Sequence, residues 1–322
     1  MYKKWTFYIV LMVILAMVGI SISVASENNH LSIGIVFNQG SLIHNKTVAN
    51  ISETLKSKYK NRINLSYFYS SDTQALEDLK KNKLDYVVSV GVETASILLA
   101  TKPNYSVLFT LIPKKSFNSL ILQYKNSLPE KYSAVFLTQP LKRKINLSKI
   151  MLGQGIKAGI ALSDIGENKY AEINRLASKS GISLNLQKIS DYNKPVDALN
   201  AALKNSDVYI AVHDKAVLNK HTAKFLLYMA YKKNIPVIGY SAGFTKAGAV
   251  ASVYSTPEQI GRQTTELLNG LIEKNNIMQL QDPEYFTVSV NERIRRIQRL
   301  EKLSINEIQL RLVEMEDGDF NE

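Results

Sequence analysis

Small or polar residues, together with one phenylalanine, follow the short apolar runs of this chain, and most could bind a small polar molecule. In the first half they are Asn38, Gln39, Ser70, Gly91, Glu93, Thr94 and Thr110, and in the second half Asp164, His213, Asp214, Ser241 and Phe244. Hydroxyls and backbone amides at a helix start bind carboxylates, and an isolated aspartate binds an ammonium group. Ser, Thr and Asp are also preferred helix N-caps, so each has a purely structural alternative.

One serine lies in a pattern that is typical of a hydrolase nucleophile. The segment Gly239-Tyr240-Ser241-Ala242-Gly243 fits the nucleophile elbow and follows an apolar run, as that motif requires. In that fold the catalytic histidine comes after the serine, whereas every histidine here precedes it: His30, His44, His213 and His221. Residues 245–250 also indicate a loop and a strand in place of the required helix. We expect no enzymatic activity, and an exported serine hydrolase using Ser241 is a less favoured alternative.

The sequence predicts no metal, no cofactor and no nucleic-acid partner. It has no cysteine, which excludes disulfides, thiolate metal sites and a thiol nucleophile. His213, Asp214 and His221 lack a second histidine in ligand register, and the glycines within 153–159 miss the dinucleotide-binding spacing. The basic run at residues 293–299 has no interleaved aromatic residues, and we interpret it as a solvated helix face.

Length and periodicity predict the fold class. The chain has 322 residues, 45% of them hydrophobic and 21% charged, with a net charge of +12, which suits a globular protein of two lobes. Strands are expected at residues 31–37, 63–69, 86–90, 106–111, 121–123, 134–137, 157–162, 183–188, 208–212 and 236–240. Helices are expected at residues 47–59, 73–81, 94–101, 141–151, 169–180, 195–204 and 215–233. This alternation predicts two doubly wound parallel α/β sheets, in two lobes joined by short crossings.

The N-terminus has the three parts of a secretory signal. Lys3 and Lys4 precede an apolar run at residues 5–18, and Ser23-Val24-Ala25 fits the cleavage pattern. We therefore predict a signal peptide over residues 1–25, with export to the periplasm. An uncleaved anchor helix is the alternative, because the apolar run approaches membrane-spanning length.

Several later segments resemble the ABC-transporter substrate-binding family that includes the tryptophan- and tyrosine-type transporters. The resemblance is specific between residues 208 and 264 and looser elsewhere. It is carried by Tyr209-Ile210-Ala211-Val212-His213-Asp214, Ile235-Pro236-Val237-Ile238-Gly239, Gly243-Phe244-Thr245-Lys246-Ala247-Gly248-Ala249 and Gly261-Arg262-Gln263-Thr264. The turn at residues 89–95 and the tail at 286–291 are also similar to that family.

This resemblance implies a type I periplasmic-binding fold with three crossings and the ligand between the lobes. Lobe 1 is expected to comprise residues 31–136 with about 253–283, and lobe 2 residues 137–252 with about 284–322. The return crossing is expected near residues 247–254. Asp214 would bind a ligand ammonium, and Thr94 with the turn at 91–93 would bind a carboxylate. Ser241 and Phe244 would line the second lobe, with Phe244 as a stacking face.

The function predicted from these residues is that of a periplasmic solute-binding protein. It would capture a small molecule, with an aromatic amino acid as the family-led hypothesis, and deliver it to an ABC permease in the inner membrane. We expect a monomer. A periplasmic sensor subunit that reports to a membrane receptor is the alternative among binding proteins.

Overall fold

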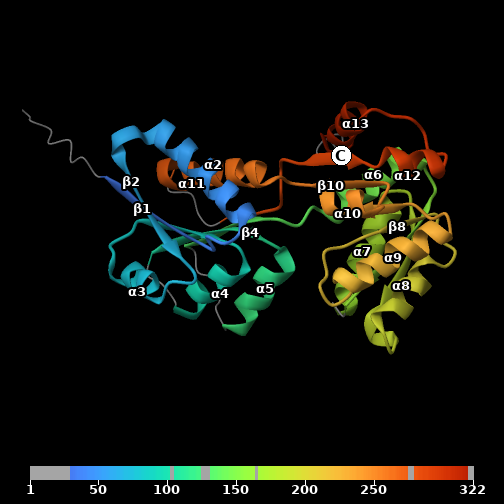
Figure 1. The fold of residues 1–322 in the computed structure, drawn as a ribbon, viewed down its shortest axis with the longest axis horizontal. Coiled ribbons are helices and arrows are strands. Elements are labelled where there is room, and N and C mark those ends of the chain that lie inside the picture. Colours follow the sequence, from blue (N-terminus) through green and yellow to red (C-terminus); the bar gives the residue numbers. More distant parts are fainter. Residues whose placement is uncertain (1–29, 102–104, 125–130, 164–165, 275–278, 318–322) are drawn as a thin grey trace, which may run out of the picture.

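Two α/β lobes stand side by side in the computed structural model (Figure 1). The structure describes residues 30–101, 105–124, 131–163, 166–274 and 279–317. The predicted signal peptide and Asp164 therefore lie outside the described residues. Within these ranges, no helix combines the length and the apolar character needed to cross a bilayer.

The first lobe is built on a six-stranded sheet in which all the strands are parallel. In spatial order the strands are β11 (Leu280–Gln281), β5 (Tyr132–Phe136), β4 (Ser106–Ile112), β3 (Tyr86–Val90), β1 (Leu31–Phe37) and β2 (Ile63–Tyr69). One face is covered by α2 (Leu42–Tyr59) and α11 (Pro257–Lys274), and the other by α3 (Thr73–Lys81), α4 (Val92–Thr101) and α5 (Lys114–Gln123) (Figure 1). Because both faces are covered, Ile33, Ile35 and Val36 are all fully buried, as a near-continuous apolar run requires.

The second lobe repeats this architecture with one strand reversed. Its six-stranded sheet has the order β12 (Thr287–Val290), β10 (Ala251–Tyr254), β9 (Val237–Gly239), β8 (Val208–Ile210), β6 (Lys157–Leu162) and β7 (Ser183–Lys188). Only β12 is antiparallel to its neighbour among these described strands. Helices α6 (Leu141–Leu152), α7 (Glu167–Lys179) and α13 (Ile305–Asp317) pack on one face, and α8 (Pro195–Leu203), α9 (Lys220–Lys232) and α10 (Ala242–Ala247) on the other. The short helix α12 (Glu292–Ile297) follows β12.

The predicted fold class of two doubly wound lobes is confirmed, while several element predictions were wrong. Residues 121–123 were expected as a strand but form the last turn of α5, because Ile121 packs on the core and Leu122 points to solvent. A helix, α10, does follow Ser241, which caps it by accepting a hydrogen bond from the Phe244 amide. Helix α9 begins only at Lys220, where Asn219 forms a capping box.

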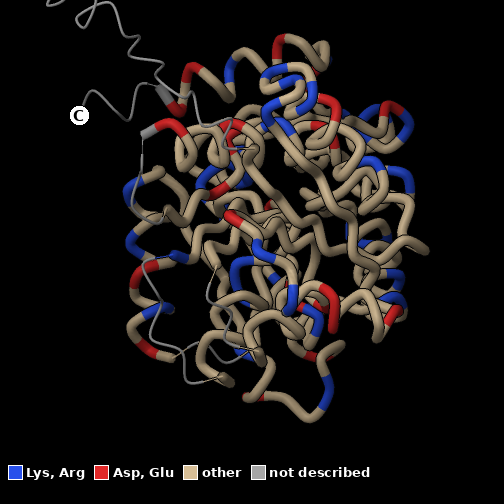
Figure 2. Tube along the Cα trace, turned by 90° about the vertical axis from the view of Figure 1, so that its left-hand side faces the viewer, with Lys and Arg blue, Asp and Glu red and all other residues tan. Residues whose placement is uncertain are grey.

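The basic run at residues 293–299 is also not a purely solvated face. The Arg295 side chain is buried and forms an ion pair with Glu292, while its Nη1 donates to the Glu301 carbonyl at 2.9 Å. Basic and acidic positions are interspersed over the side of the molecule seen in Figure 2, so the net charge of +12 is not gathered on that side.

Three segments cross between the lobes, and a single arginine connects polar groups of two of them. The crossings are residues 137–140, 255–256 and 282–286, so the return crossing follows β10 instead of lying within residues 247–254. Arg143 Nη1 donates to Gln139 Oε1 at 2.5 Å and to the Pro283 carbonyl at 2.8 Å. Gln139 Nε2 donates to Ser255 Oγ at 2.7 Å, and that hydroxyl donates to the Tyr285 carbonyl at 2.7 Å. We call these residues the crossing network.

Arg143 is also held from the side of the C-terminal helix. Its Nη2 donates to Glu316 Oε2 at 2.6 Å, and its guanidinium lies 4.3 Å from the centroid of the Phe286 ring. The arginine side chain is 6% exposed, so the ion pair is shielded from water. Removing one partner of such a pair leaves the other charge without compensation.

We predict that Arg143→Ala lowers the free energy of unfolding by about 3 kcal/mol, because Glu316 and the crossing carbonyls lose their donor. The matched control is Arg262→Ala. Arg262 also pairs with a glutamate and stacks on a tyrosine, but its side chain is 61% exposed, so the expected loss is below about 1 kcal/mol. Urea denaturation measures both, and equal losses would contradict the role assigned to Arg143.

Candidate functional site

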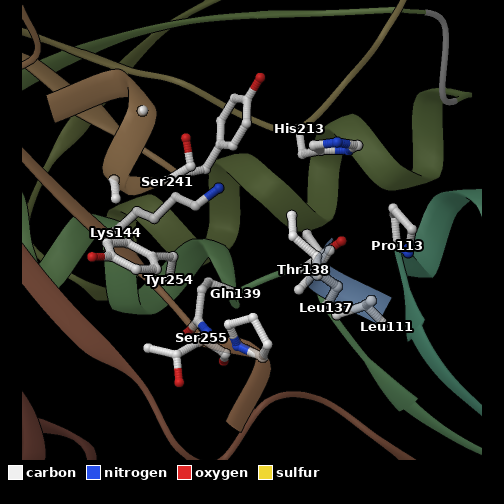
Figure 3. Close-up of a pocket in the computed structure, with 16 residues that line it drawn as sticks. Leu111, Pro113, Leu137, Thr138, Gln139, Lys144, His213, Ser241, Tyr254 and Ser255 are labelled. Carbon is white, nitrogen blue, oxygen red and sulfur yellow. Dashed lines mark hydrogen bonds between the residues drawn. The ribbon is translucent and has the colours of Figure 1, made fainter. Parts of the chain in front are cut away.

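A cavity of about 460 Å³ lies where the two lobes meet. The first lobe contributes Ile43, Leu111 and Pro113, and the crossings contribute Leu137, Thr138, Gln139, Ser255 and Thr256. The second lobe contributes Lys144, His213, Tyr240, Ser241 and Tyr254. The surface of the cavity is mainly apolar, and the polar side chains come from the second lobe and the crossings (Figure 3). This composition is typical of a small-molecule site.

Lys144 is the charged side chain of this cavity. It projects from α6, is 1% exposed, and its amine is directed toward the space between Ser241 and His213 (Figure 3). Nζ donates to the Ala211 carbonyl at 3.2 Å and lies 5.8 Å from the centroid of the Tyr240 ring. Burial lowers the pKa of Lys144 from its ordinary value to about 8. The amine is therefore a largely protonated cation at neutral pH that is surrounded by uncharged groups.

His213 adds a neutral ring beside this cation. It follows β8 and packs edge-to-face against Tyr240, with the ring centroids 5.2 Å apart. Burial lowers the pKa of His213, and the nearby charge of Lys144 lowers it further. At neutral pH the imidazole is therefore uncharged and can donate one hydrogen bond and accept another.

A second cavity of about 350 Å³ adjoins the first and shares Pro113 and His213 with it. Here Lys115 of the first lobe reaches Asp214 of the second, with Nζ 2.9 Å from Oδ2. The Ser163 hydroxyl donates to the same carboxylate oxygen at 2.6 Å and the Ser163 amide does so at 3.1 Å. Burial alone would raise the pKa of Asp214, but the bonds from Ser163 and Lys115 outweigh it and hold the pKa below its usual value. An ion pair therefore connects the lobes.

The family of the chain follows from comparison with known proteins. The model of the family described as ABC transporter substrate binding protein matches residues 43–304, which is most of the sequence. The chain belongs to this family. No curated protein sequence matches the substrate-binding protein described here.

Several solved structures share the fold of this chain. A ligand-free, open substrate-binding protein with adhesive properties from Clostridium difficile is 17% identical with a TM-score of 0.67, covering 86% of this chain and 97% of that one. A conserved domain protein from Vibrio cholerae is 18% identical, with a TM-score of 0.56 over 88% of this chain and 98% of that one. A domain from Streptococcus pneumonia in complex with L-Trp is 13% identical, with a TM-score of 0.54 over 84% and 95%. At these identities the likeness shows the fold, which is the predicted type I periplasmic-binding fold.

The predicted residues of the first lobe form a structured turn beside the cavities. Asn38 Nδ2 donates to Glu93 Oε2 at 3.2 Å, and the Asn38 amide donates to His44 Nδ1 at 3.3 Å. Gly91 has a φ of +96°, and a Cβ there would lie 2.6 Å from the His44 ring, so only glycine fits. Gln39 is exposed, and neither cavity is lined by Asn38, Gln39, Gly91 or Glu93.

The remaining predicted hydroxyls of this lobe are buried in its interior. Thr94 donates to the Gly91 carbonyl at 3.2 Å at the start of α4, and it lines neither cavity. Thr110 and Thr264 share a hydrogen bond of 2.6 Å between β4 and α11. Ser70 is buried, and its hydroxyl has no partner among the described residues.

Of the four described residues that were predicted in the second lobe, three line the interlobe cavities and one does not. Ser241 and His213 line the larger cavity, and Asp214 and His213 line the smaller one. Phe244 does not form the predicted stacking face, because it is 8% exposed and packs in the core below Tyr240, with the ring centroids 4.6 Å apart. Asp214, predicted to bind a ligand ammonium, is already bonded to Lys115 and Ser163.

Sequence reasoning missed Lys144, Lys115, Tyr240 and Tyr254 as cleft residues. Lys144 stands in the run Leu141-Lys142-Arg143-Lys144, which resembles an ordinary exposed helix face. The signal that was available is the position of this helix directly after the first crossing. Tyr240 lies inside the elbow motif, in which only Ser241 was predicted to bind the ligand.

Helix α10 meets the requirement of the elbow motif for a helix after Ser241, which the sequence pattern had predicted to be missing. The Ser241 hydroxyl accepts the Phe244 amide at 3.3 Å, and no hydrogen bond joins it to a histidine among the described residues. Across the same ranges, no group of His, Asp and Glu is arranged to hold a metal ion.

We predict that Lys115→Ala shifts the substrate-binding protein toward an open arrangement, because the ion pair between the lobes is lost. Lys115 is 49% exposed, so the pair contributes up to about 1 kcal/mol, or about fivefold in the ratio of closed to open molecules. The radius of gyration from small-angle X-ray scattering should increase without ligand. Lys169→Ala removes a pair within one helix and should leave the radius unchanged. An unchanged radius in the Lys115 variant would contradict the prediction.

We predict that Lys144→Met stabilises the ligand-free protein at neutral pH. The folded pKa of about 8 lies below the ordinary 10.5, so between these values the unfolded chain binds more protons and stability rises with pH. The free energy of unfolding of the variant should therefore exceed that of the wild type by about 3 kcal/mol below this window, and the difference should shrink as pH rises through it. Urea denaturation at about pH 7 and about pH 10 tests this. A variant that is less stable at neutral pH would refute it.

Proposed function

We propose that this chain is the extracytoplasmic solute receptor of an ABC importer. The observation that carries the proposal is a cavity of about 460 Å³ lined by both lobes and by crossing residues, in a chain of the substrate-binding family. A ligand in such a position contacts both lobes at once. Because an open arrangement loses the contacts to one of the lobes, ligand binding favours the closed one without any catalytic step.

The cavity supports a ligand of the size of a single amino acid or another small aromatic molecule. Tyr240 and Tyr254 offer ring faces, while Leu111, Leu137 and Pro113 offer apolar contact. An aromatic body is therefore the part of the earlier amino-acid hypothesis that we retain. The amino group has no evident partner, because no Asp or Glu is among the described residues that line the larger cavity.

The location and partners of the protein belong to the same proposal. The basic, apolar and small-residue sequence of the first 25 residues supports export with cleavage after Ala25. In the periplasm the closed protein would deliver its solute to a membrane permease, acting as a monomer without a cofactor. For the permease to distinguish the closed protein, it must contact both lobes at once. Only the closed state holds the two lobes in a fixed relative orientation.

The test is a thermal-shift screen of the mature protein against amino acids, organic acids, amines, sugars, nucleosides and short peptides. A ligand at about 100 times its dissociation constant adds roughly 2.7 kcal/mol to stability, which raises Tm by several degrees. We expect one chemical class to produce such a rise. The only tryptophan of the chain, Trp5, lies in the predicted signal, so tryptophan and other indoles can be followed by their own fluorescence. Folded protein that responds to no class would contradict a receptor function.

A further inference from the structure

The charge of Lys144 sets it apart from the other buried basic side chains. The described basic residues that are buried are Arg143, Lys144 and Arg295. Arg143 is paired with Glu316, and Arg295 with Glu292. Lys144 forms no ion pair with any carboxylate of the described chain, and its one protein hydrogen bond goes to the Ala211 carbonyl at 3.2 Å. The cation therefore has no counter-charge among the described residues of the protein.

A buried, unpaired ammonium group lowers the stability of the folded protein unless a negative charge or a hydrogen-bond acceptor offsets its lost hydration. A buried charge without a partner loses its hydration and gains little in return, and the lowered pKa of Lys144 reflects this loss. The amine cannot turn to bulk solvent, because the side chain is 1% exposed. It can still reach the interlobe cavity, of which it is a lining residue. A ligand in the cavity is therefore the group in the right place to neutralise it.

The rest of the cavity restricts the chemistry of that ligand. Its surface is mainly apolar, with Leu111, Leu137, Tyr240 and Tyr254 among the lining residues, and its other polar side chains are uncharged. One cation matches one negative charge. No lining side chain among the described residues is acidic. Asp214 lies in the adjoining cavity and is bonded to Lys115 and Ser163. An ammonium group would therefore enter without a counter-ion.

We propose that the solute is a small monocarboxylic acid with an apolar or aromatic body and no amino group, and that Lys144 binds its carboxylate. The Ser241 hydroxyl and the neutral His213 ring line the same space and are able to donate to the second carboxylate oxygen. The apolar body occupies the space toward Leu111 and Pro113 (Figure 3). This inference rests on the proposed receptor function and specifies its ligand class.

The experiment compares four compounds that share a phenyl group and differ in the charged or polar group attached to it. Phenylacetate, phenylacetamide, phenethylamine and L-phenylalanine are titrated into the mature wild-type protein by calorimetry, beside a panel of aliphatic and aromatic monocarboxylates. We expect monocarboxylates to bind and the matched amide and amine to bind at least about 30-fold more weakly. Lys144→Met should weaken carboxylate binding by a similar factor while raising Tm, because the variant no longer buries a charge.

The matched control is Lys149→Met, the same substitution on the same helix at a position that does not line the cavity. It should bind carboxylates as the wild type does. Both variants are compared for Tm and circular dichroism, so a folding defect is recognised directly. If Lys144 had a structural role only, Lys144→Met would lower Tm and would not discriminate between the acid and its amide.

Three results would overturn the inference. The first is a preference for the amine, the amide or the amino acid, and the second is carboxylate binding that survives Lys144→Met. Either would leave the receptor function standing, because a solute still binds. The third is a flat response across every class in the broader screen, which would contradict the receptor function itself and the ligand class with it.

Discussion

The three crossings must be held in register, and Arg143 is the side chain through which they are connected. It bonds to Gln139 in the first crossing and to Pro283 in the third, while Gln139 in turn bonds to Ser255 in the second. A guanidinium suits this task because its planar donors point in several fixed directions at once. The position of one lobe against the other, and with it the shape of the cavity, depends on this connection.

The next residue along the same helix has the opposite character. Lys144 carries the same charge as Arg143, yet it meets an apolar cavity in place of a carboxylate. Neighbouring positions on a helix differ by about 100° in direction, so α6 turns one cation toward the crossings and the other toward the cleft. Helix α6 therefore carries both the arginine that connects the crossings and the lysine that lines the cavity.

The sequence predicted most of the strands and the two-lobe division, because apolar runs bounded by polar residues leave little choice in a doubly wound fold. The sequence-based prediction failed where the local sequence pattern and the tertiary packing favour different structures. Residues 121–123 have β-like composition but complete an amphipathic helix, and the glycine-rich segment after Ser241 conceals a short helix. Lys144 was missed because charge in sequence suggests exposure, and only the packing of α6 buries it. Phe244 was misjudged because the direction of the backbone within one helical turn decides whether its side chain faces the core or the cleft.

The ion pair between Lys115 and Asp214 joins the two lobes directly, through side chains of the protein alone. Part of the free energy of closure therefore comes from the protein itself, and less of it has to come from ligand contacts. Because one partner is half exposed, dissolved salt screens this contribution. The apparent affinity for a solute would then depend on ionic strength even if that solute carried no charge. The affinity of the protein for its solute would then vary with the salinity of its surroundings. This dependence would arise from the contact between the lobes and not from the residues that bind the solute.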